Sequence, residues 1–200
     1  MIQRKEYLEK LISWKNEKVI KVITGIRHCG KSTLLKLYRD YLLQNNITAD
    51  CIFFINFEDL EYEHLLDYKL LYNYITEKLN KDSMNYIFLD EIQKVPEFEK
   101  VVDSLYIKDN VDLYITGSNA FLLSGELATL LSGRYIEINM FPLSFSEYCE
   151  TKDTTDIDIL FSEFMHTGGL PYISYFGAED DRIDMYLEGI YNTIIIKDIE

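Results

Sequence analysis

The chain has 200 residues and a mass of 23.6 kDa, which suits one domain or one domain with a small appendage. A hydrophobic fraction of 48% and a charged fraction of 27% are typical of a globular protein and exclude a disordered chain. The net charge is −14, but residues 1–50 carry 10 Lys and Arg against 5 Asp and Glu. The acidic remainder disfavours a broad nucleic-acid-binding face.

Apolar patterning predicts helices and strands that alternate along the chain. We expect helices at 4–14, 32–44, 65–79, 98–106 and 120–131, and strands at 19–24, 51–56, 86–89, 113–116 and 135–138. This alternation predicts an α/β fold, with a parallel sheet of five strands flanked by helices.

Past Phe141-Pro142 the strand pattern stops, and helices are expected at 144–150, at 157–166 and from 180 onward. We therefore predict a core over residues 1–142 and a small helical lid over 143–200. The last helical pattern still continues at Glu200, so we expect the chain to be part of a longer protein.

The N-terminus and the cysteines indicate in which cellular compartment the protein is expected. No apolar signal region follows Met1, and the longest apolar run, 51–55, is far too short to span a membrane. Cys29, Cys51 and Cys149 are odd in number and lack metal-like spacing, so we expect free thiols. These features predict a cytoplasmic protein without a membrane segment.

The segment Gly25-Ile-Arg-His-Cys-Gly-Lys-Ser32 matches the phosphate-loop pattern G-x-x-x-x-G-K-[ST] in full, between a predicted strand and a predicted helix. Gly25 and Gly30 allow backbone amides to surround phosphates, and the helix N-terminus adds positive potential. Lys31 is expected to reach the β- and γ-phosphates, and the Ser32 hydroxyl to bind Mg²⁺. The remaining loop positions are also assigned to the nucleotide, mainly through their backbone: Arg27, His28, Cys29 and Thr33.

Two carboxylates, Asp90 and Glu91, follow the apolar strand at 86–89. Downstream of a phosphate loop, this pattern predicts that Asp90 coordinates the Mg²⁺ held by Ser32. Glu91 is expected to orient and polarise the water that attacks the γ-phosphorus. A polar strand end at 116–119 and the lack of an Asn-Lys-x-Asp guanine motif favour ATP over GTP.

Three further positions each have a structural alternative. Asn119, or Ser118, is expected to hydrogen-bond the γ-phosphate or the attacking water, although Gly-Ser-Asn is also a common turn and helix cap. Arg134 suits the γ-phosphate of a neighbouring subunit, or else only pairs with an acidic neighbour or a helix end. Pro171, in Gly168-Gly-Leu-Pro171, either contacts adenine or only ends a helix.

Together these segments resemble the AAA-type ATPase domain of archaeal and bacterial ATPases related to the STAND class of signalling NTPases. The resemblance extends over nearly the whole chain and rests on six segments: 25–35, 88–93, 116–119, 131–134, 141–148 and 168–171. It implies a five-stranded ATPase core, a helical lid, and ATP with Mg²⁺ as ligands. It also implies Arg134 as a phosphate-sensing arginine, Pro171 as an adenine contact, and a further C-terminal domain beyond residue 200.

Two functions are therefore expected from the sequence. The first is Mg²⁺-dependent hydrolysis of ATP to ADP and phosphate, within a homo-oligomer or with a protein partner. The alternative is a STAND-type switch that turns over slowly and acts through a nucleotide-dependent population shift. Nucleic-acid remodelling is disfavoured, because only residues 1–50 are net basic.

Overall fold

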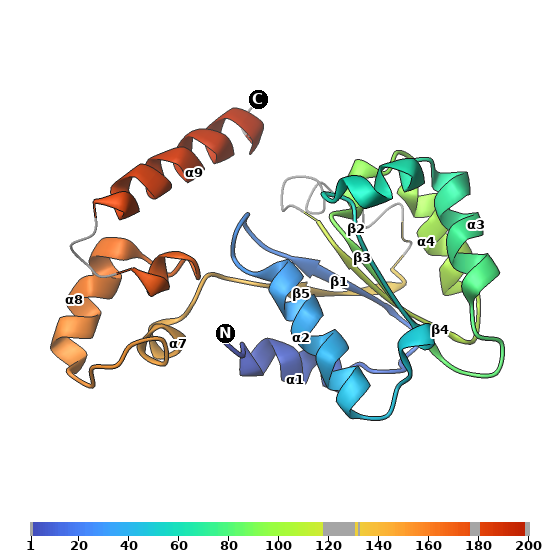
Figure 1. Cartoon of the computed structure of the whole chain (residues 1–200), viewed down its shortest axis with the longest axis horizontal. Helices are drawn as coiled ribbons and strands as arrows, with labels where there is room; N and C mark the ends of the chain where they lie inside the picture. Colours follow the sequence, from blue (N-terminus) through green and yellow to red (C-terminus); the bar gives the residue numbers. More distant parts are fainter. Residues whose placement is uncertain (1, 118–130, 132, 177–180, 199–200) are drawn as a thin grey trace. The chain divides into compact units, whose positions relative to one another are not determined.

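The computed structural model describes residues 2–117, 131, 133–176 and 181–198 (Figure 1). The chain divides into two compact units. The sheet unit comprises Lys5–Gly25 and Lys31–Asn139, and the lid unit comprises Met1–Arg4, Ile26–Gly30 and Met140–Glu200. The phosphate-loop pattern thus contributes residues to both units, and the domain boundary near residue 142 stays a prediction.

Five parallel strands form the sheet, in the order β2-β3-β4-β1-β5. Their bounds are β1 Ile20–Thr24, β2 Ile52–Asn56, β3 Asn85–Asp90, β4 Val111–Thr116 and β5 Tyr135–Asn139. The predicted α/β class with a five-stranded parallel sheet is confirmed. The strands β1, β3 and β4 are buried along their whole length, as expected of a sheet covered on both faces.

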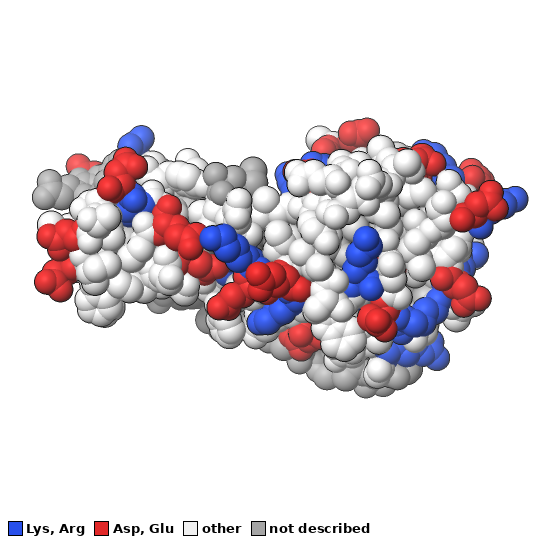
Figure 2. All heavy atoms as spheres, turned by 90° about the horizontal axis from the view of Figure 1, so that it is seen from below, with Lys and Arg blue, Asp and Glu red and all other residues white. Residues whose placement is uncertain are grey.

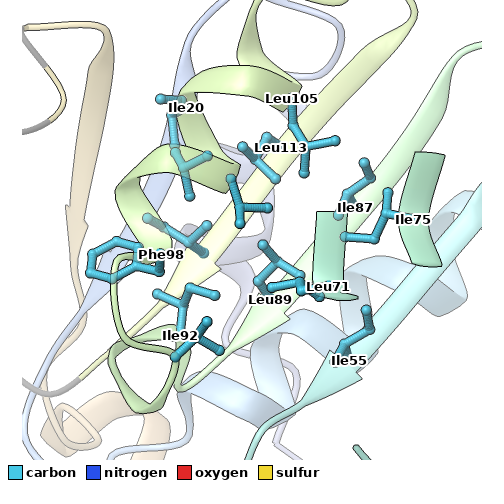
Figure 3. Close-up of a cluster of buried hydrophobic side chains, with 14 of the residues drawn as sticks. Ile20, Ile55, Leu71, Ile75, Ile87, Leu89, Ile92, Phe98, Leu105 and Leu113 are labelled. Carbon is cyan, nitrogen blue, oxygen red and sulfur yellow. The ribbon is translucent and has the colours of Figure 1, made fainter. Parts of the chain in front are cut away.

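Helices cover both faces of the sheet. The sheet unit contains α1 (Lys5–Ser13), α2 (Lys31–Gln44), α3 (Tyr68–Lys78) and α4 (Phe98–Tyr106). The helices α3 and α4 pack on one face (Figure 1). There Leu71 and Phe98 join alternate strand residues such as Ile87 and Leu113 in one buried hydrophobic cluster (Figure 3). This core fixes the strand register, because a shift by one residue would turn the apolar side chains to the other face.

The opposite face, under α2, contains a buried hydrogen-bonded network. Lys21 is fully buried in β1, and its Nζ lies 2.5 Å from Asp112 Oδ1. Asp112 Oδ2 accepts from Tyr114 Oη at 2.9 Å, which lies 2.9 Å from Tyr38 Oη of α2. Burial lowers the Lys21 pKa, although the adjacent Asp112 opposes that shift. The network ties α2 to β1 and β4 through satisfied polar groups rather than apolar contacts alone.

One predicted helix is divided in the structure. The pattern at 65–79 predicts a single helix, whereas a short 3-10 helix ends at Leu65 and α3 begins at Tyr68. Asp67 causes the break, because its side chain accepts hydrogen bonds from the backbone N–H groups of Lys69 and Leu70 and so caps a new helix. Short 3-10 helices occupy Ala49–Cys51, Leu60–Leu65, Ile92–Lys94 and Ile173–Tyr175.

The lid unit contains α7 (Phe145–Cys149), α8 (Ile157–Thr167) and α9 (Arg182–Asp198). A capping box between Ser144 and Glu147 starts α7. Next to it, Leu143 N–H donates to Gly169 O at 2.6 Å, and a Cβ at Gly169 would lie 2.3 Å from Leu143 O. Only glycine permits this approach, which joins the end of α8 to the start of α7. No described helix has the length and apolar character needed to cross a membrane.

Candidate functional site

The candidate site lies at the carboxyl ends of the strands. Gly25 follows β1, Asp90 ends β3 and Thr116 ends β4. The register pairs Ile23 with Thr116 and Leu89 with Ile115, so these ends lie along one edge of the parallel sheet. Open α/β sheets bind their ligands at this edge. The strand β4 lies between β1 and β3, and therefore brings Thr116 between the phosphate loop and Asp90.

The helix α2 begins at Lys31, so Lys31, Ser32 and Thr33 form its first turn. Lys31 is 5% exposed, and its Nζ donates to Gly25 O at 3.0 Å. This bond draws the ammonium back along the loop toward the end of β1. Ser32 and Thr33 remain partly exposed at the helix N-terminus, where the helix dipole favours anions.

Asp90 is fully buried, and its two carboxylate oxygens differ. Oδ1 accepts a hydrogen bond from Thr116 Oγ1 at 2.5 Å, whereas Oδ2 has no hydrogen-bond partner although it is buried. A buried carboxylate oxygen without a donor is unfavourable unless a cation compensates it. The donor set fits a divalent ion, because carboxylate and hydroxyl oxygens are ligands that Mg²⁺ prefers.

Thr116 connects the two acidic residues, and sequence reasoning gave it no role. Its Oγ1 donates to Asp90 Oδ1 and accepts from the backbone N–H of Glu91 at 3.0 Å. One hydroxyl thus positions the Asp90 side chain and the Glu91 backbone together. The signal in the sequence was a hydroxyl residue at the very end of a buried strand, two positions before Ser118.

Glu91 has an unusual backbone conformation. Its φ of 58° and ψ of 46° place it in the left-handed region, which non-glycine residues adopt at a cost. Such strain is concentrated at functional sites, where the surrounding contacts impose it. The Glu91 Oε2 accepts from Gln93 Nε2 at 2.5 Å, so the carboxylate is held by a side chain two residues further on.

The middle of the loop belongs to the lid unit. Cys29 is fully buried, and the Arg27 Nε is buried without a hydrogen-bond partner. His28 is exposed, and the centre of its ring lies 6.5 Å from that of Tyr186. Gly30 has a φ of 102°, and a Cβ there would lie 3.9 Å from Pro171 Cγ. The structure therefore brings Pro171 next to the phosphate-loop segment.

One predicted residue, Arg134, is not brought to this edge. Arg134 Nη1 lies 3.2 Å from Asp103 Oδ1, and Arg134 O accepts from Ile20 N–H at 2.9 Å. Ile20 begins β1 and Thr24 ends it, so Arg134 lies at the opposite edge of the sheet within its own chain. Asn119 and Ser118 lie outside the described residues.

Comparison with curated proteins finds relatives along the whole chain. An uncharacterized protein of Haemophilus influenzae is 44% identical over 204 residues, covering 100% of this chain and 50% of that protein. An uncharacterized protein of Methanocaldococcus jannaschii is 30% identical over 194 residues, covering 89% of this chain and 42% of that protein. The chain thus spans about half the length of these relatives.

Solved structures share the fold at low identity. The Walker-type ATPase of Pyrococcus abyssi has a TM-score of 0.62 at 18% identity, covering 96% of this chain and 72% of that one. AMPPCP-bound DnaA from Aquifex aeolicus has a TM-score of 0.54 at 12% identity, covering 96% of this chain and 60% of that one. A P-loop NTPase fold is therefore shared with known ATPases. A family model described as an AAA domain matches residues 17–149, and the chain belongs to this AAA domain family of P-loop proteins.

Proposed function

We propose that the protein binds ATP with Mg²⁺ and hydrolyses it to ADP and phosphate. The observation that carries this proposal is the set of groups at one sheet edge: Lys31, the half-satisfied carboxylate of Asp90, and Glu91. A phosphate loop alone supports binding, whereas an acidic pair beside it also supplies metal coordination and a base for water.

The metal would be held by the Ser32 hydroxyl and the buried Asp90 Oδ2. When bound, Mg²⁺ neutralises charge on the β- and γ-phosphates. Thr116 keeps Asp90 Oδ1 engaged and so leaves Oδ2 to the ion. Lys31 would exchange its bond to Gly25 O for phosphate oxygens, at the start of a helix whose dipole favours the same charge.

Glu91 would orient the attacking water and take up its proton. In our proposal Asn119 contacts the γ-phosphate or that water, and Pro171 contacts adenine from beside Gly30. The backbone N–H groups of residues 27–33 would surround the phosphates.

Nucleotide titration followed by a turnover assay tests the proposal. Lys31→Ala should remove most ATP binding, while Lys36→Ala, an exposed lysine on the same helix, should leave it unchanged. Glu91→Gln should keep ATP affinity and lower turnover by about 100-fold or more. Parental turnover in Glu91→Gln would contradict the role of Glu91, and no binding of ATP by the parental chain would contradict the function itself.

A second candidate function, the slow nucleotide-dependent switch, is favoured by the Gln93–Glu91 hydrogen bond. A base whose carboxylate is held by a neighbouring amide is not free to turn toward water. If that bond restrains turnover, Gln93→Ala should hydrolyse ATP faster than the parental chain. Tightly bound ADP in the purified protein, with negligible turnover in the parental chain and faster turnover in Gln93→Ala, would favour the switch over steady hydrolysis.

Arg134 is proposed to act on the γ-phosphate of a neighbouring copy, because it lies away from the edge that carries its own chain's phosphate loop. Sedimentation with and without ATP tests assembly. Mixing Arg134→Ala with Lys31→Ala should then restore some turnover if the arginine acts between subunits.

In Figure 2, acidic and basic side chains intermingle on the face shown, a mixture that disfavours nucleic acid as a ligand of this face.

A further inference from the structure

Arg4 is an arginine that is almost completely buried, although it lies near the N-terminus. The residue is 4% exposed, and its φ of 46° places it in the left-handed region. A buried guanidinium is unfavourable unless acceptors satisfy it, and a non-glycine residue adopts this φ only when other contacts impose it. The surroundings of Arg4 within the lid unit therefore need an explanation.

The guanidinium contacts groups that lie far from Arg4 in the sequence. Nη1 donates to the carbonyl of Cys29, inside the phosphate loop, at 3.2 Å. Nη2 donates to Phe141 O at 2.6 Å, and Nε lies 2.9 Å from Glu147 Oε1. The planar, forked guanidinium can donate to two carbonyls while it forms an ion pair with a carboxylate, which a lysine ammonium on a flexible stem does less well.

The contact with Cys29 has a direct consequence for the loop. A trans peptide unit is planar, so its C=O and its N–H point in opposite directions. By holding Cys29 O, Arg4 also fixes the orientation of the Gly30 N–H, which points away from Arg4. Gly30, with a φ of 102°, would otherwise have wide conformational freedom.

Glu147 determines what Arg4 contributes. Its carboxylate neutralises the guanidinium and also completes the capping box that starts α7. The pair therefore adds no net charge to attract a phosphate. The pair instead fixes an orientation, because Arg4 binds the Cys29 carbonyl while it also contacts Phe141 and Glu147 of α7.

We infer that Arg4, held by Glu147, is a positioning residue that presets the phosphate loop for nucleotide through the Cys29 carbonyl. The inference rests on the proposed function, since it assumes that the loop binds phosphate. It adds a residue outside the loop motif, 25 positions upstream of Cys29, on which affinity depends.

The test compares Arg4→Lys and Arg4→Ala with the matched control Arg39→Lys, in which a partly exposed arginine paired with Asp40 is changed. Isothermal titration with Mg²⁺ and ATP is combined with hydrogen exchange of residues 26–31 in the nucleotide-free, folded protein. We expect Arg4→Lys to weaken ATP binding about tenfold and to speed exchange in the loop, with Arg39→Lys unchanged on both measures. A purely structural role would change the unfolding midpoint without changing the ATP affinity of the folded chain.

If Arg4→Lys stays folded and binds ATP like the parental chain, the inference is overturned whatever happens to exchange. Glu147→Gln provides a second variant in case changes at Arg4 prevent folding, and it should weaken ATP binding in the same direction. Unchanged affinity in Glu147→Gln would overturn the inference as well. Failure of the parental chain to bind ATP would instead overturn the proposed function, so the two failures can be told apart.

Discussion

The Thr116 hydroxyl donates a hydrogen bond to Asp90 Oδ1 across 2.5 Å, between the ends of two neighbouring strands. The same oxygen accepts from the Glu91 N–H, so that one side chain orders both acidic positions. The catalytic roles proposed for this pair would thus depend on Thr116, to which the proposal assigns no contact with the metal or the water.

Thr116→Val should therefore affect both stability and turnover. Valine keeps the shape but leaves the buried Asp90 Oδ1 and the partly buried Glu91 N–H without this hydroxyl, at a cost of about 2 to 3 kcal/mol. ATP turnover should fall and need more Mg²⁺, because Asp90 is no longer held. Thr116→Ser, which keeps the hydroxyl, should behave like the parental chain in urea unfolding and in Mg²⁺ titration. Equal Mg²⁺ dependence in the valine and serine variants would refute this role of the hydroxyl.

Glu91→Gly should raise stability while removing turnover. Glycine adopts the left-handed conformation without strain, but it also raises the conformational entropy of the unfolded chain. The net gain in the free energy of unfolding is about 1 kcal/mol. Glu97 provides a matched control, because it has the same φ of 58° but lies outside the site. Glu97→Gly should gain similar stability in urea unfolding and keep its ATPase rate. A destabilised Glu91→Gly would show that the backbone there is not strained.

Gly169→Ala should destabilise the lid unit. The new Cβ would lie 2.3 Å from Leu143 O, so the backbone has to shift, at a cost of about 1 to 3 kcal/mol. Gly189→Ala is the matched control: it lies within α9 with open space around the Cβ position, and should gain up to about 1 kcal/mol. Thermal unfolding compares the two. A Gly169→Ala protein as stable as Gly189→Ala would contradict the close approach of residues 143 and 169.

Tyr86→Phe should change how stability depends on alkaline pH. Burial, with a smaller contribution from the Asp112 charge, raises the pKa of Tyr86 to about 12. A phenol whose folded-state pKa is raised stabilises the fold below its unfolded pKa of about 10, and this contribution is lost as pH rises from there to 12. The loss is at most about 1.4 kcal/mol per pH unit.

The parental chain should be about 1 kcal/mol more stable than Tyr86→Phe at pH 8, because Tyr86 Oη donates to Asn16 Oδ1. This difference should shrink above pH 10. The lowered pKa of Lys21 acts with the opposite sign but is common to both chains, so the difference isolates Tyr86. A constant difference in urea unfolding between pH 8 and pH 11 would count against the raised pKa.

The sequence predicted the fold well because its strong signals are local. The strand positions, the helix at 98–106 and the helix after the phosphate loop follow from apolar periodicity and from glycine placement. The break at Asp67 was missed, since a helix cap competes with an apolar pattern that continues on both sides of it. A side chain that caps its own backbone leaves no mark on hydrophobic periodicity.

The residues of the site that sequence reasoning missed act over long separations. Thr116 and Asp90 are 26 positions apart, and Arg4 and Phe141 are 137 apart. No spacing rule links such pairs before the strand order is known. Lys21 and Asp112 gave a weak signal, as charged residues within buried strands, but only the sheet topology identifies them as partners.

The contacts of Arg4 affect where a shortened recombinant version of the protein should end. A recombinant fragment that stops after β5, at Asn139, retains the sequence of the five described strands together with Lys31, Asp90 and Glu91. It nevertheless omits Phe141 and Glu147, which both contact the Arg4 guanidinium. Assays on such a minimal piece would then understate the affinity of the longer polypeptide, and a boundary beyond Cys149 is the safer choice.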